Sequence, residues 1–303
     1  MKLLLGETSP EFDLLEAPLL AEKKVSLLVA RLDKIHPVVS GNKLFKLHYF
    51  LEASLSGGNK PILTFGGAYS NHLVATAYAC ALAGIKCIGI VRGEKAETIS
   101  HTLQHCEAYG MQLHFVSRDE YHNKETDSFI EQLRLEFGEF ILVPEGGYDP
   151  LGADGASLIM DWISGKNATH VCTAVGTATT LAGLLKKRNN NETIIGVPVL
   201  KNMADIAARL SFLGCGQQPS NLVLFNEYHF GGYAKKTQAL LDFMNGLYST
   251  HGIPTDFVYT AKMMYAVMEQ VKAGYFPEGS NIVCLHTGGL QGNNSLAAGT
   301  LVF

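Results

Sequence analysis

The sequence has no apolar run that approaches the roughly 20 residues of a membrane-spanning helix. Glycine, histidine, threonine or a charged residue interrupts each hydrophobic stretch. The leucines at positions 3–5 are too few for the apolar region of a signal peptide, because Gly6 and Glu7 follow at once. We therefore expect a cytoplasmic protein with no membrane partner.

Clustered positive charge and paired cysteines are missing as well. The 24 Lys and Arg residues are scattered and the net charge is −4, so there is no basic stripe to bind a nucleic acid. The six cysteines form no C-x-x-C pair, which argues against zinc sites and disulfides. We expect free thiols, no bound metal and no nucleic-acid partner.

The chain does contain enough apolar material for a large core, with 47% hydrophobic residues among 303. Short β-branched runs alternate with longer apolar-periodic stretches, which predicts an α/β fold of parallel strands joined by helices. The length favours two lobes. The expected strands are Val25–Arg31, Pro61–Phe65, Cys87–Arg92, Gln112–Val116, Phe140–Val143, His170–Val175, Thr193–Val197, Asn221–Phe225 and Asn281–His286.

Three of these strands lead into turns of small residues, at Gly66–His72, Gly176–Thr180 and Thr287–Gly289. Ligands of open parallel sheets bind beyond the carboxyl ends of the strands, so we expect the three turns to line one site. Helices are predicted to follow two of the turns, at Asn71–Leu82 and Thr179–Lys187.

The turn Gly176–Thr180 has the chemistry of a phosphate cradle. Glycine lets the backbone approach closely, threonines donate hydroxyls, and the following helix points free N–H groups outward. No Gly-Lys-Ser/Thr follows, and the further glycines of a dinucleotide fingerprint are absent, which disfavours a nucleotide. The alternative is a plain tight turn in which Thr179 is the helix N-cap.

Lys43 follows the turn Ser40–Asn42 and precedes the apolar helical stretch Leu44–Ala53, where an amine can project into a cleft. Loss of solvation there would lower the pKa of the amine and free it to form an imine. The alternative is a solvated surface charge, which is what we expect for Lys46.

Ser70, Asn71 and His72 open a helix that otherwise contains mostly Ala, Val, Leu and Cys. These polar groups therefore gather at the anion-attracting end of the helix, where a substrate carboxylate could bind. The alternative is an ordinary serine N-cap with an exposed Asn71 and His72.

Taken together, these motifs resemble the D-cysteine desulfhydrase and 1-aminocyclopropane-1-carboxylate deaminase family. The resemblance runs from about Arg31 to Gly292 and implies pyridoxal 5′-phosphate, a small amino-acid substrate and a homodimer. It also implies the two-domain tryptophan synthase β-like architecture, fold type II, with the cofactor in the interdomain cleft. We divide the chain into a large cofactor-binding domain, 1–46 plus 147–303, and a small domain, 47–146. The segments that match are Ser40–Lys43, Thr64–His72, Val175–Gly183, Val258-Tyr259 and His286–Gly289.

The resemblance also implies roles for individual residues. Lys43 would form the Schiff base, Asn71 would bond the phenolic oxygen of the cofactor, and Ser70, Asn71 and His72 would bind the substrate carboxylate. Tyr259 and, by a looser match, Tyr233 would be active-site tyrosines. The cofactor phosphate and ring would be held by Gly176, Thr177, Ala178, Thr179 and Thr180, and by Thr260 and Thr287.

Two positions distinguish the branches of this family. Deaminases that resemble this chain have Glu and Leu where Thr260 and Thr287 stand here, whereas the desulfhydrase branch has threonines. A carboxylate keeps the pyridine nitrogen protonated and strengthens the electron sink, and a hydroxyl does so less. Ala178 is a further departure, because relatives commonly have glycine there, and alanine at a positive φ costs about 1 kcal/mol.

We therefore expect α,β-elimination from a small D-amino acid, with D-cysteine giving pyruvate, ammonia and sulfide. Deamination of 1-aminocyclopropane-1-carboxylate to 2-oxobutyrate and ammonia, with Tyr259 as nucleophile, is the alternative within the family. A non-catalytic cofactor-binding protein and a nucleotide-dependent oxidoreductase are alternatives of other classes. Ser70, Tyr233 and Tyr259 beside Lys43 argue against a mere carrier, which needs no acid and base groups.

Overall fold

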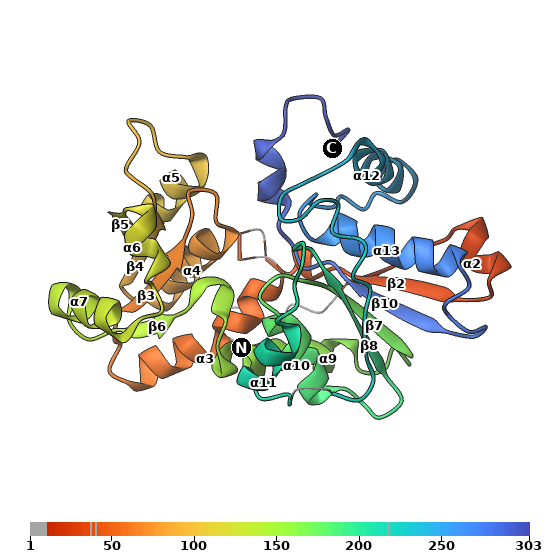
Figure 1. The fold of residues 1–303 in the computed structure, drawn as a ribbon, viewed down its shortest axis with the longest axis horizontal. Helices are drawn as coiled ribbons and strands as arrows, with labels where there is room; N and C mark the ends of the chain where they lie inside the picture. Colours follow the sequence, from red (N-terminus) through yellow and green to blue (C-terminus); the bar gives the residue numbers. More distant parts are fainter. Residues whose placement is uncertain (1–10, 37, 40, 217–218) are drawn as a thin grey trace.

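The computed structural model describes residues 11–36, 38–39, 41–216 and 219–303, which form two lobes, each around its own sheet (Figure 1). The larger sheet has six strands in the spatial order β1-β2-β10-β7-β8-β9. In that order they span Phe12–Leu14, Ser26–Ala30, Asn281–Leu285, His170–Val175, Thr193–Pro198 and Leu222–Leu224.

The smaller sheet has four parallel strands in the order β5-β4-β3-β6. The larger sheet is also parallel, except that β1 pairs antiparallel with β2. The predicted α/β fold with parallel sheets is therefore confirmed. The strands of the smaller sheet span Met111–Val116, Cys87–Arg92, Ile62–Gly66 and Ile141–Val143.

Each of the nine expected strands coincides with an observed one, with ends that differ by no more than one residue. β1 was not expected from the sequence. It has only three residues and lies at the edge of its sheet, so its sequence, FDL, is too short to show an apolar alternation.

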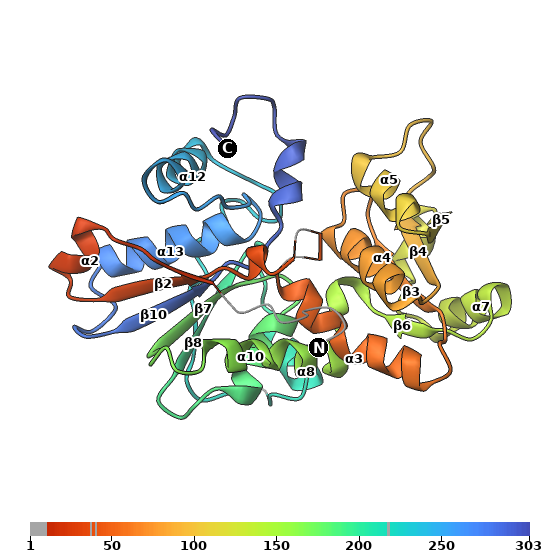
Figure 2. The same ribbon diagram turned by 180° about the vertical axis from the view of Figure 1, so that it is seen from behind.

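Helices cover both faces of both sheets (Figures 1 and 2). The predicted helices at 71–82 and 179–187 are observed as α4 and α10. Short 3₁₀ turns are η1 (Leu32–Lys34), η2 (Glu145–Gly147) and η3 (Leu290–Ser295). The α-helices are α2 (Pro18–Glu22), α3 (Asn42–Ser56), α4 (Asn71–Ala83), α5 (His101–Ala108), α6 (Arg118–His122), α7 (Asp127–Phe137), α8 (Pro150–Ser157), α9 (Ile159–Ile163), α10 (Thr179–Lys187), α11 (Ile206–Phe212), α12 (Gln238–His251) and α13 (Thr260–Lys272).

One hydrophobic core continues from the larger lobe into the smaller one through α3. Phe45, Leu47 and Phe50 of this helix are at most 2% exposed and belong to a cluster with side chains of both sheets. Burial of each contributes about 1.5–3 kcal/mol. A Cβ at Gly155 of α8 would lie 2.1 Å from the Phe45 carbonyl oxygen, so the two helices meet backbone to backbone. Figure 2 shows α3 running from the junction into the smaller lobe.

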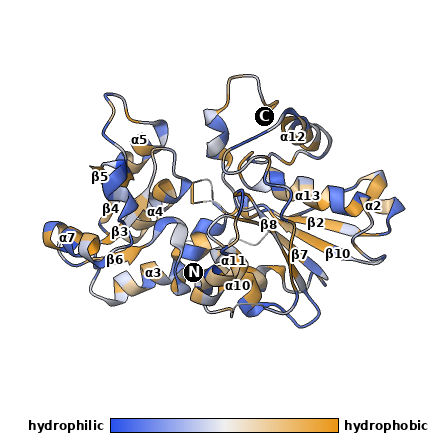
Figure 3. Cartoon of the chain, viewed as in Figure 1, coloured by the Kyte–Doolittle hydropathy of each residue, from blue (hydrophilic) through white to orange (hydrophobic). Residues whose placement is uncertain are grey.

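Strands in Figure 3 are largely orange, whereas surface loops are bluer, as expected for sheets that are covered on both faces. Among the helices of the described residues, none is both long and apolar enough to cross a membrane. All strands of the smaller sheet lie between residues 62 and 143. We retain 46 and 147 as proposed domain boundaries, although residues 1–10 of the proposed large domain lie outside the described part.

Candidate active site

Lys43 lies in the first turn of α3, at the junction of the lobes. Gly41 precedes the helix with φ +70°, and a Cβ there would lie 1.9 Å from the Thr287 carbonyl oxygen, so only glycine fits. Lys43 Nζ donates to Asn42 Oδ1 at 2.8 Å, and Asn42 Nδ2 donates to Thr180 Oγ1 at 2.7 Å. The Asn42 side chain thus links the Lys43 amine to the turn after β7. Ser40 of the sequence motif lies outside the described residues.

The surroundings of Lys43 favour its neutral form. Burial lowers the pKa of this amine from 10.5 to about 8, although the Asp256 carboxylate opposes the shift. Its Nζ lies 5.9 Å from the centre of the Tyr259 ring. Lys43 is therefore not the solvated surface charge of the alternative interpretation.

Lys46 contradicts the expectation of a solvated charge, because it is only 5% exposed. It follows Lys43 by three residues and so lies on the same face of α3. Its Nζ donates to the Gly146 carbonyl oxygen at 3.0 Å, and burial together with the Lys43 cation lowers its pKa well below the usual value. A Cβ at Gly146 would lie 3.1 Å from Thr177 Cγ2, so Lys46 reaches the edge of the expected phosphate turn.

The turn Gly176–Thr180 leaves the start of α10 open. Ala178 precedes the helix in the left-handed conformation, φ 67°, and no side-chain hydrogen bond caps the helix. The idea that Thr179 is the N-cap is therefore wrong: Thr179 is the first helical residue, and its Oγ1 lies 2.9 Å from Thr177 Oγ1. The free N–H groups of this first turn suit a phosphate.

The start of α4 is arranged differently. Ser70 is the N-cap and accepts a hydrogen bond from Leu73 N at 3.3 Å. Asn71 Oδ1 is buried without a hydrogen-bond partner in the described residues. His72 is not exposed as the alternative expected: it is 4% exposed, its Nε2 lies 2.9 Å from Thr64 Oγ1, and its Nδ1 has no partner in the described residues. Burial, followed by the cations Lys43 and Lys46, lowers the pKa of His72 to about 3.

The two predicted tyrosines face each other, with ring centres 6.1 Å apart. Burial, and next the neighbouring Tyr233, raises the pKa of Tyr259 well above its usual value. Tyr233 is 56% exposed. A Cβ at Gly176 would lie 3.2 Å from Tyr259 Cε1, so the Tyr259 ring packs against the first residue of the turn Gly176–Thr180.

Two buried charged residues that the sequence analysis did not select hold the segments that carry Tyr233 and Tyr259. Lys262 is fully buried, and its Nζ donates to the carbonyl oxygens of His229 and Gly232, at 2.9 and 2.7 Å, which ties the loop before Tyr233 to α13. Asp256 is 1% exposed and accepts hydrogen bonds from residues 258–260. Asp256 lies four residues before the first residue of α13 and not at its N-cap position, so no capping signal in the sequence pointed to it.

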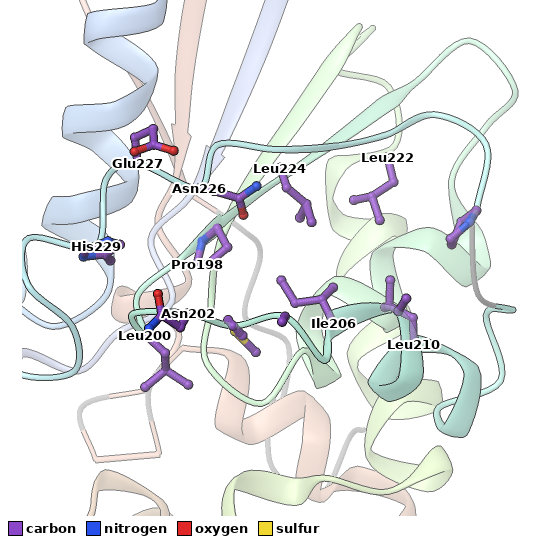
Figure 4. Close-up of a pocket in the computed structure, with 14 residues that line it drawn as sticks. Pro198, Leu200, Asn202, Ile206, Leu210, Leu222, Leu224, Asn226, Glu227 and His229 are labelled. Atoms are coloured by element: carbon purple, nitrogen blue, oxygen red, sulfur yellow. The ribbon is translucent and has the colours of Figure 1, made fainter.

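A pocket of about 820 Å³ lies elsewhere, between strands β8 and β9 and helix α11 (Figure 4). Ile206, Leu210, Leu222 and Leu224 form its apolar wall. None of the predicted site residues lines it. The pocket is therefore distinct from the site at Lys43.

A lysine of low pKa beside an open helix start, at the carboxyl edge of a parallel sheet, defines a site for an anionic group that reacts with amines. A family model described as pyridoxal-phosphate dependent enzyme matches residues 11–288. The chain therefore belongs to the pyridoxal-phosphate-dependent enzyme family, and pyridoxal phosphate is its cofactor.

Individual relatives agree with this assignment. The chain is 30% identical over 285 residues (88% of this chain, 89% of the relative) to the "Putative 1-aminocyclopropane-1-carboxylate deaminase" of Thermotoga maritima. It is 27% identical over 290 residues (89% and 86%) to the protein of the same name from Pyrococcus abyssi.

Solved structures confirm the predicted fold type II architecture. An ACC deaminase homologue matches with a TM-score of 0.79 at 24% identity, covering 95% of this chain and 92% of the other. A hydrogen sulfide-producing enzyme from Fusobacterium nucleatum matches with a TM-score of 0.68 at 15% identity, covering 97% and 98%.

Proposed function

We propose that the protein is a lyase that performs α,β-elimination on a small D-amino acid, with D-cysteine as the expected substrate. The observation that carries the proposal is the connection from the Lys43 amine through Asn42 to Thr180, in a site with threonines at 260 and 287. D-cysteine would give pyruvate, ammonia and sulfide.

The residues present fit the cofactor. Lys43 would attach to its aldehyde carbon, and Gly176, Thr177, Ala178, Thr179 and Thr180 would hold its phosphate. The open start of α10 supplies N–H donors for that phosphate, and the Lys46 amine lies at the edge of the same turn, where it donates to the Gly146 carbonyl oxygen. Asn71 Nδ2, which lies beside Gly289, would donate to the phenolic oxygen. When bound, the cofactor supplies an electron sink for the negative charge that develops at Cα.

The substrate carboxylate would bind at the start of α4. Ser70 Oγ already accepts the Leu73 N–H but keeps its own proton, so it can donate to a carboxylate oxygen. The backbone N–H groups of Asn71 and His72 lie in the first turn and can do the same. The His72 side chain contacts Thr64 through Nε2, and we assign the contact with the carboxylate to the His72 backbone N–H.

Proton transfer would involve Lys43 and the tyrosines. The Lys43 amine, when free, would take the Cα proton, because its lowered pKa leaves part of it neutral near pH 7. Tyr259 stays protonated owing to its raised pKa, so its Oη can donate a hydrogen bond to the sulfur while the Cβ–S bond breaks and the sulfur leaves as hydrosulfide. Water then converts the released aminoacrylate to pyruvate and ammonia. Tyr233, half exposed beside Tyr259, would close the outer side of the site.

The test supplies the purified holoenzyme with D-cysteine and measures pyruvate and sulfide, with L-cysteine as the stereochemical control. Equal amounts of both products from the D-enantiomer are expected. A bound chromophore without turnover of D-cysteine would reject this substrate.

Deamination of 1-aminocyclopropane-1-carboxylate is the second candidate, and the names of the relatives favour it. Formation of 2-oxobutyrate from that substrate, without pyruvate from D-cysteine, would decide for it. A chromophore on Lys43 with no turnover of either compound would favour a cofactor-binding protein. The expected homodimer stays a prediction, which analytical ultracentrifugation would test.

A further inference from the structure

The loop of residues 229–234 carries Tyr233 in a backbone conformation that its sequence does not favour. Four of its positions have a positive φ, which is 52° at Phe230, 93° at Gly231, 118° at Gly232 and 54° at Ala234. Two of these four are not glycine, and for them the left-handed conformation is unfavourable. Tyr233 itself is 56% exposed, so packing of its own ring does little to hold it. Contacts made by the rest of the loop must therefore fix this conformation.

The Lys262 amine makes such contacts from inside α13. Its Nζ donates to the carbonyl oxygens of His229 and Gly232 at 2.9 and 2.7 Å, and we call these two hydrogen bonds the Lys262 clamp. Between the two carbonyls in sequence, Phe230 packs against Tyr265 of the same helix, with ring centres 5.0 Å apart. Lys262 is 0% exposed and forms no ion pair within the described ranges. Because an apolar side chain could fill this space without the cost of burying an amine, the two bonds are what this lysine contributes.

The Lys262 clamp does not depend on the protonation state of the amine. Burial lowers the pKa of Lys262 to about 8, although the Asp256 carboxylate opposes the shift. The ammonium form has three N–H donors. The neutral amine keeps two of them, one for each carbonyl oxygen, so both forms can hold the loop.

The same helix start that carries Lys262 also carries Tyr259. Tyr259 is the N-cap of α13, and Lys262 follows it by three residues, so the two are neighbours on the helix surface. The Tyr259 ring lies 5.9 Å from Lys43 Nζ. The Tyr233 ring meets it at an angle of 70°, with ring centres 6.1 Å apart. One turn of helix therefore fixes Tyr259 directly and Tyr233 through the loop.

We propose that Lys262 is a positioning residue, which holds Tyr233 against Tyr259 so that the two phenol groups act as a unit on the leaving group of the substrate. This inference rests on the proposed function, in which Tyr259 Oη meets the sulfur. Without the Lys262 clamp, the Tyr233 ring is free to move away from Tyr259, because more than half of its surface is exposed. Attachment of the cofactor at Lys43 does not involve the loop and should stay intact.

Variants at three positions separate this role from a contribution to folding. K262M removes the amine but keeps an unbranched side chain of similar length, and the contact of Phe230 with Tyr265 remains. G232A disturbs the loop from its own backbone: a Cβ there has room, 3.5 Å from Lys201 Cβ, but φ 118° opposes it. Y233A removes the residue that is positioned. K272M, at the exposed end of α13, is the matched control for K262M.

The experiment uses the holoenzyme and has two readouts. Hydrogen–deuterium exchange measures the loop, and K262M should speed exchange of the amides at 231–235 whereas K272M should not. Steady-state kinetics with D-cysteine measure the consequence, and kcat/KM should fall roughly 10- to 100-fold in K262M and G232A, as expected for a group misplaced by about 1 Å. In the Y233A background neither substitution should cause a further loss, because residues that act through one another are not additive.

Unchanged exchange of the loop in K262M would overturn the inference, and so would losses in K262M and Y233A that simply add. If K262M does not fold, G232A decides, and a loss that persists in the Y233A background would count against the positioning of Tyr233. A wild type that has its cofactor on Lys43, shown by borohydride labelling, but does not convert D-cysteine would instead reject the proposed function. The exchange measurement then still judges the Lys262 clamp.

Discussion

The two helix starts that flank Lys43 differ in what satisfies their free N–H groups. At α4 the Ser70 hydroxyl caps the helix, whereas at α10 Ala178 offers no side-chain cap. Both helices follow a buried strand of a parallel sheet, so the contrast lies in the turn residues alone. A self-capped start is complete without a ligand and suits a substrate that comes and goes. An uncapped start suits a phosphate that stays bound.

The largest expected effect follows from removing the amine between these two helix starts. Lys43→Ala should abolish covalent attachment of the cofactor and lower kcat/KM by at least about a thousandfold, because attachment and proton transfer both need this amine. Borohydride labelling and steady-state kinetics measure the two effects. Lys60→Ala, at an exposed lysine in the segment after α3, is the control. Normal labelling in the Lys43 variant would contradict the assignment.

Loss of a hydroxyl at the start of α10 should weaken binding of the cofactor. Thr180→Val removes the acceptor of the 2.7 Å bond from Asn42 and leaves a buried donor unpaired. The loss of this bond costs about 1–3 kcal/mol of stability with or without the cofactor. The cofactor phosphate loses the same hydroxyl, a loss of similar size that should raise the dissociation constant of the cofactor roughly 5- to 150-fold. Fluorescence titration of the apoenzyme measures it. Thr180→Ser keeps the hydroxyl and should bind nearly normally, and equal losses in both variants would argue against the hydrogen bond.

The pH dependence of cofactor attachment tests the lowered pKa of Lys43 at the junction of the two lobes. Only the neutral amine reacts, so the attachment rate should rise about tenfold per pH unit up to the Lys43 pKa of about 8 and level off above it. The unfolded chain binds more protons than the folded one between this pKa and 10.5, so the lysine contribution to stability improves as pH rises through that window. Stopped-flow absorbance of cofactor uptake gives the profile. A rate still rising tenfold per unit near pH 10 would contradict the lowered pKa.

Loss of the serine cap at the start of α4 should leave binding of the cofactor unchanged. Ser70→Ala removes a helix cap and should lower the free energy of unfolding by about 1 kcal/mol. It should also raise KM several-fold while the cofactor dissociation constant stays unchanged. Ser117→Ala, at the cap of α6, should cost similar stability without any change in KM. Identical KM values for the two variants would remove Ser70 from the substrate site.

The smallest effect concerns the strained residue before α10. Ala178 has φ 67°, a conformation that costs alanine about 1 kcal/mol relative to glycine. Ala178→Gly should therefore raise the free energy of unfolding of the apoenzyme by up to about 1 kcal/mol, less the entropy that glycine adds to the unfolded chain. Urea denaturation measures this change. A clear destabilisation would show that the alanine is not strained.

Much of the site could be predicted because its signals are local. The strand ends were placed within one residue, and Lys43, the turn at 176–180 and Ser70 were selected from their neighbours in the sequence. Lys46, Lys262 and Asp256 could not be assessed in this way. A lysine in a helix is usually solvated, and only the surrounding elements show that Lys46 and Lys262 have lost their water.

The sequence by itself determined the alternation of strands and helices and the chemistry of each turn, because backbone preferences and apolar periodicity act over a few residues. Tertiary structure decided which turns meet. Asn42 bonds Thr180 across 138 positions, and Gly41 packs on Thr287. It also decided the charge state of Lys43, because burial lowers the pKa of this amine.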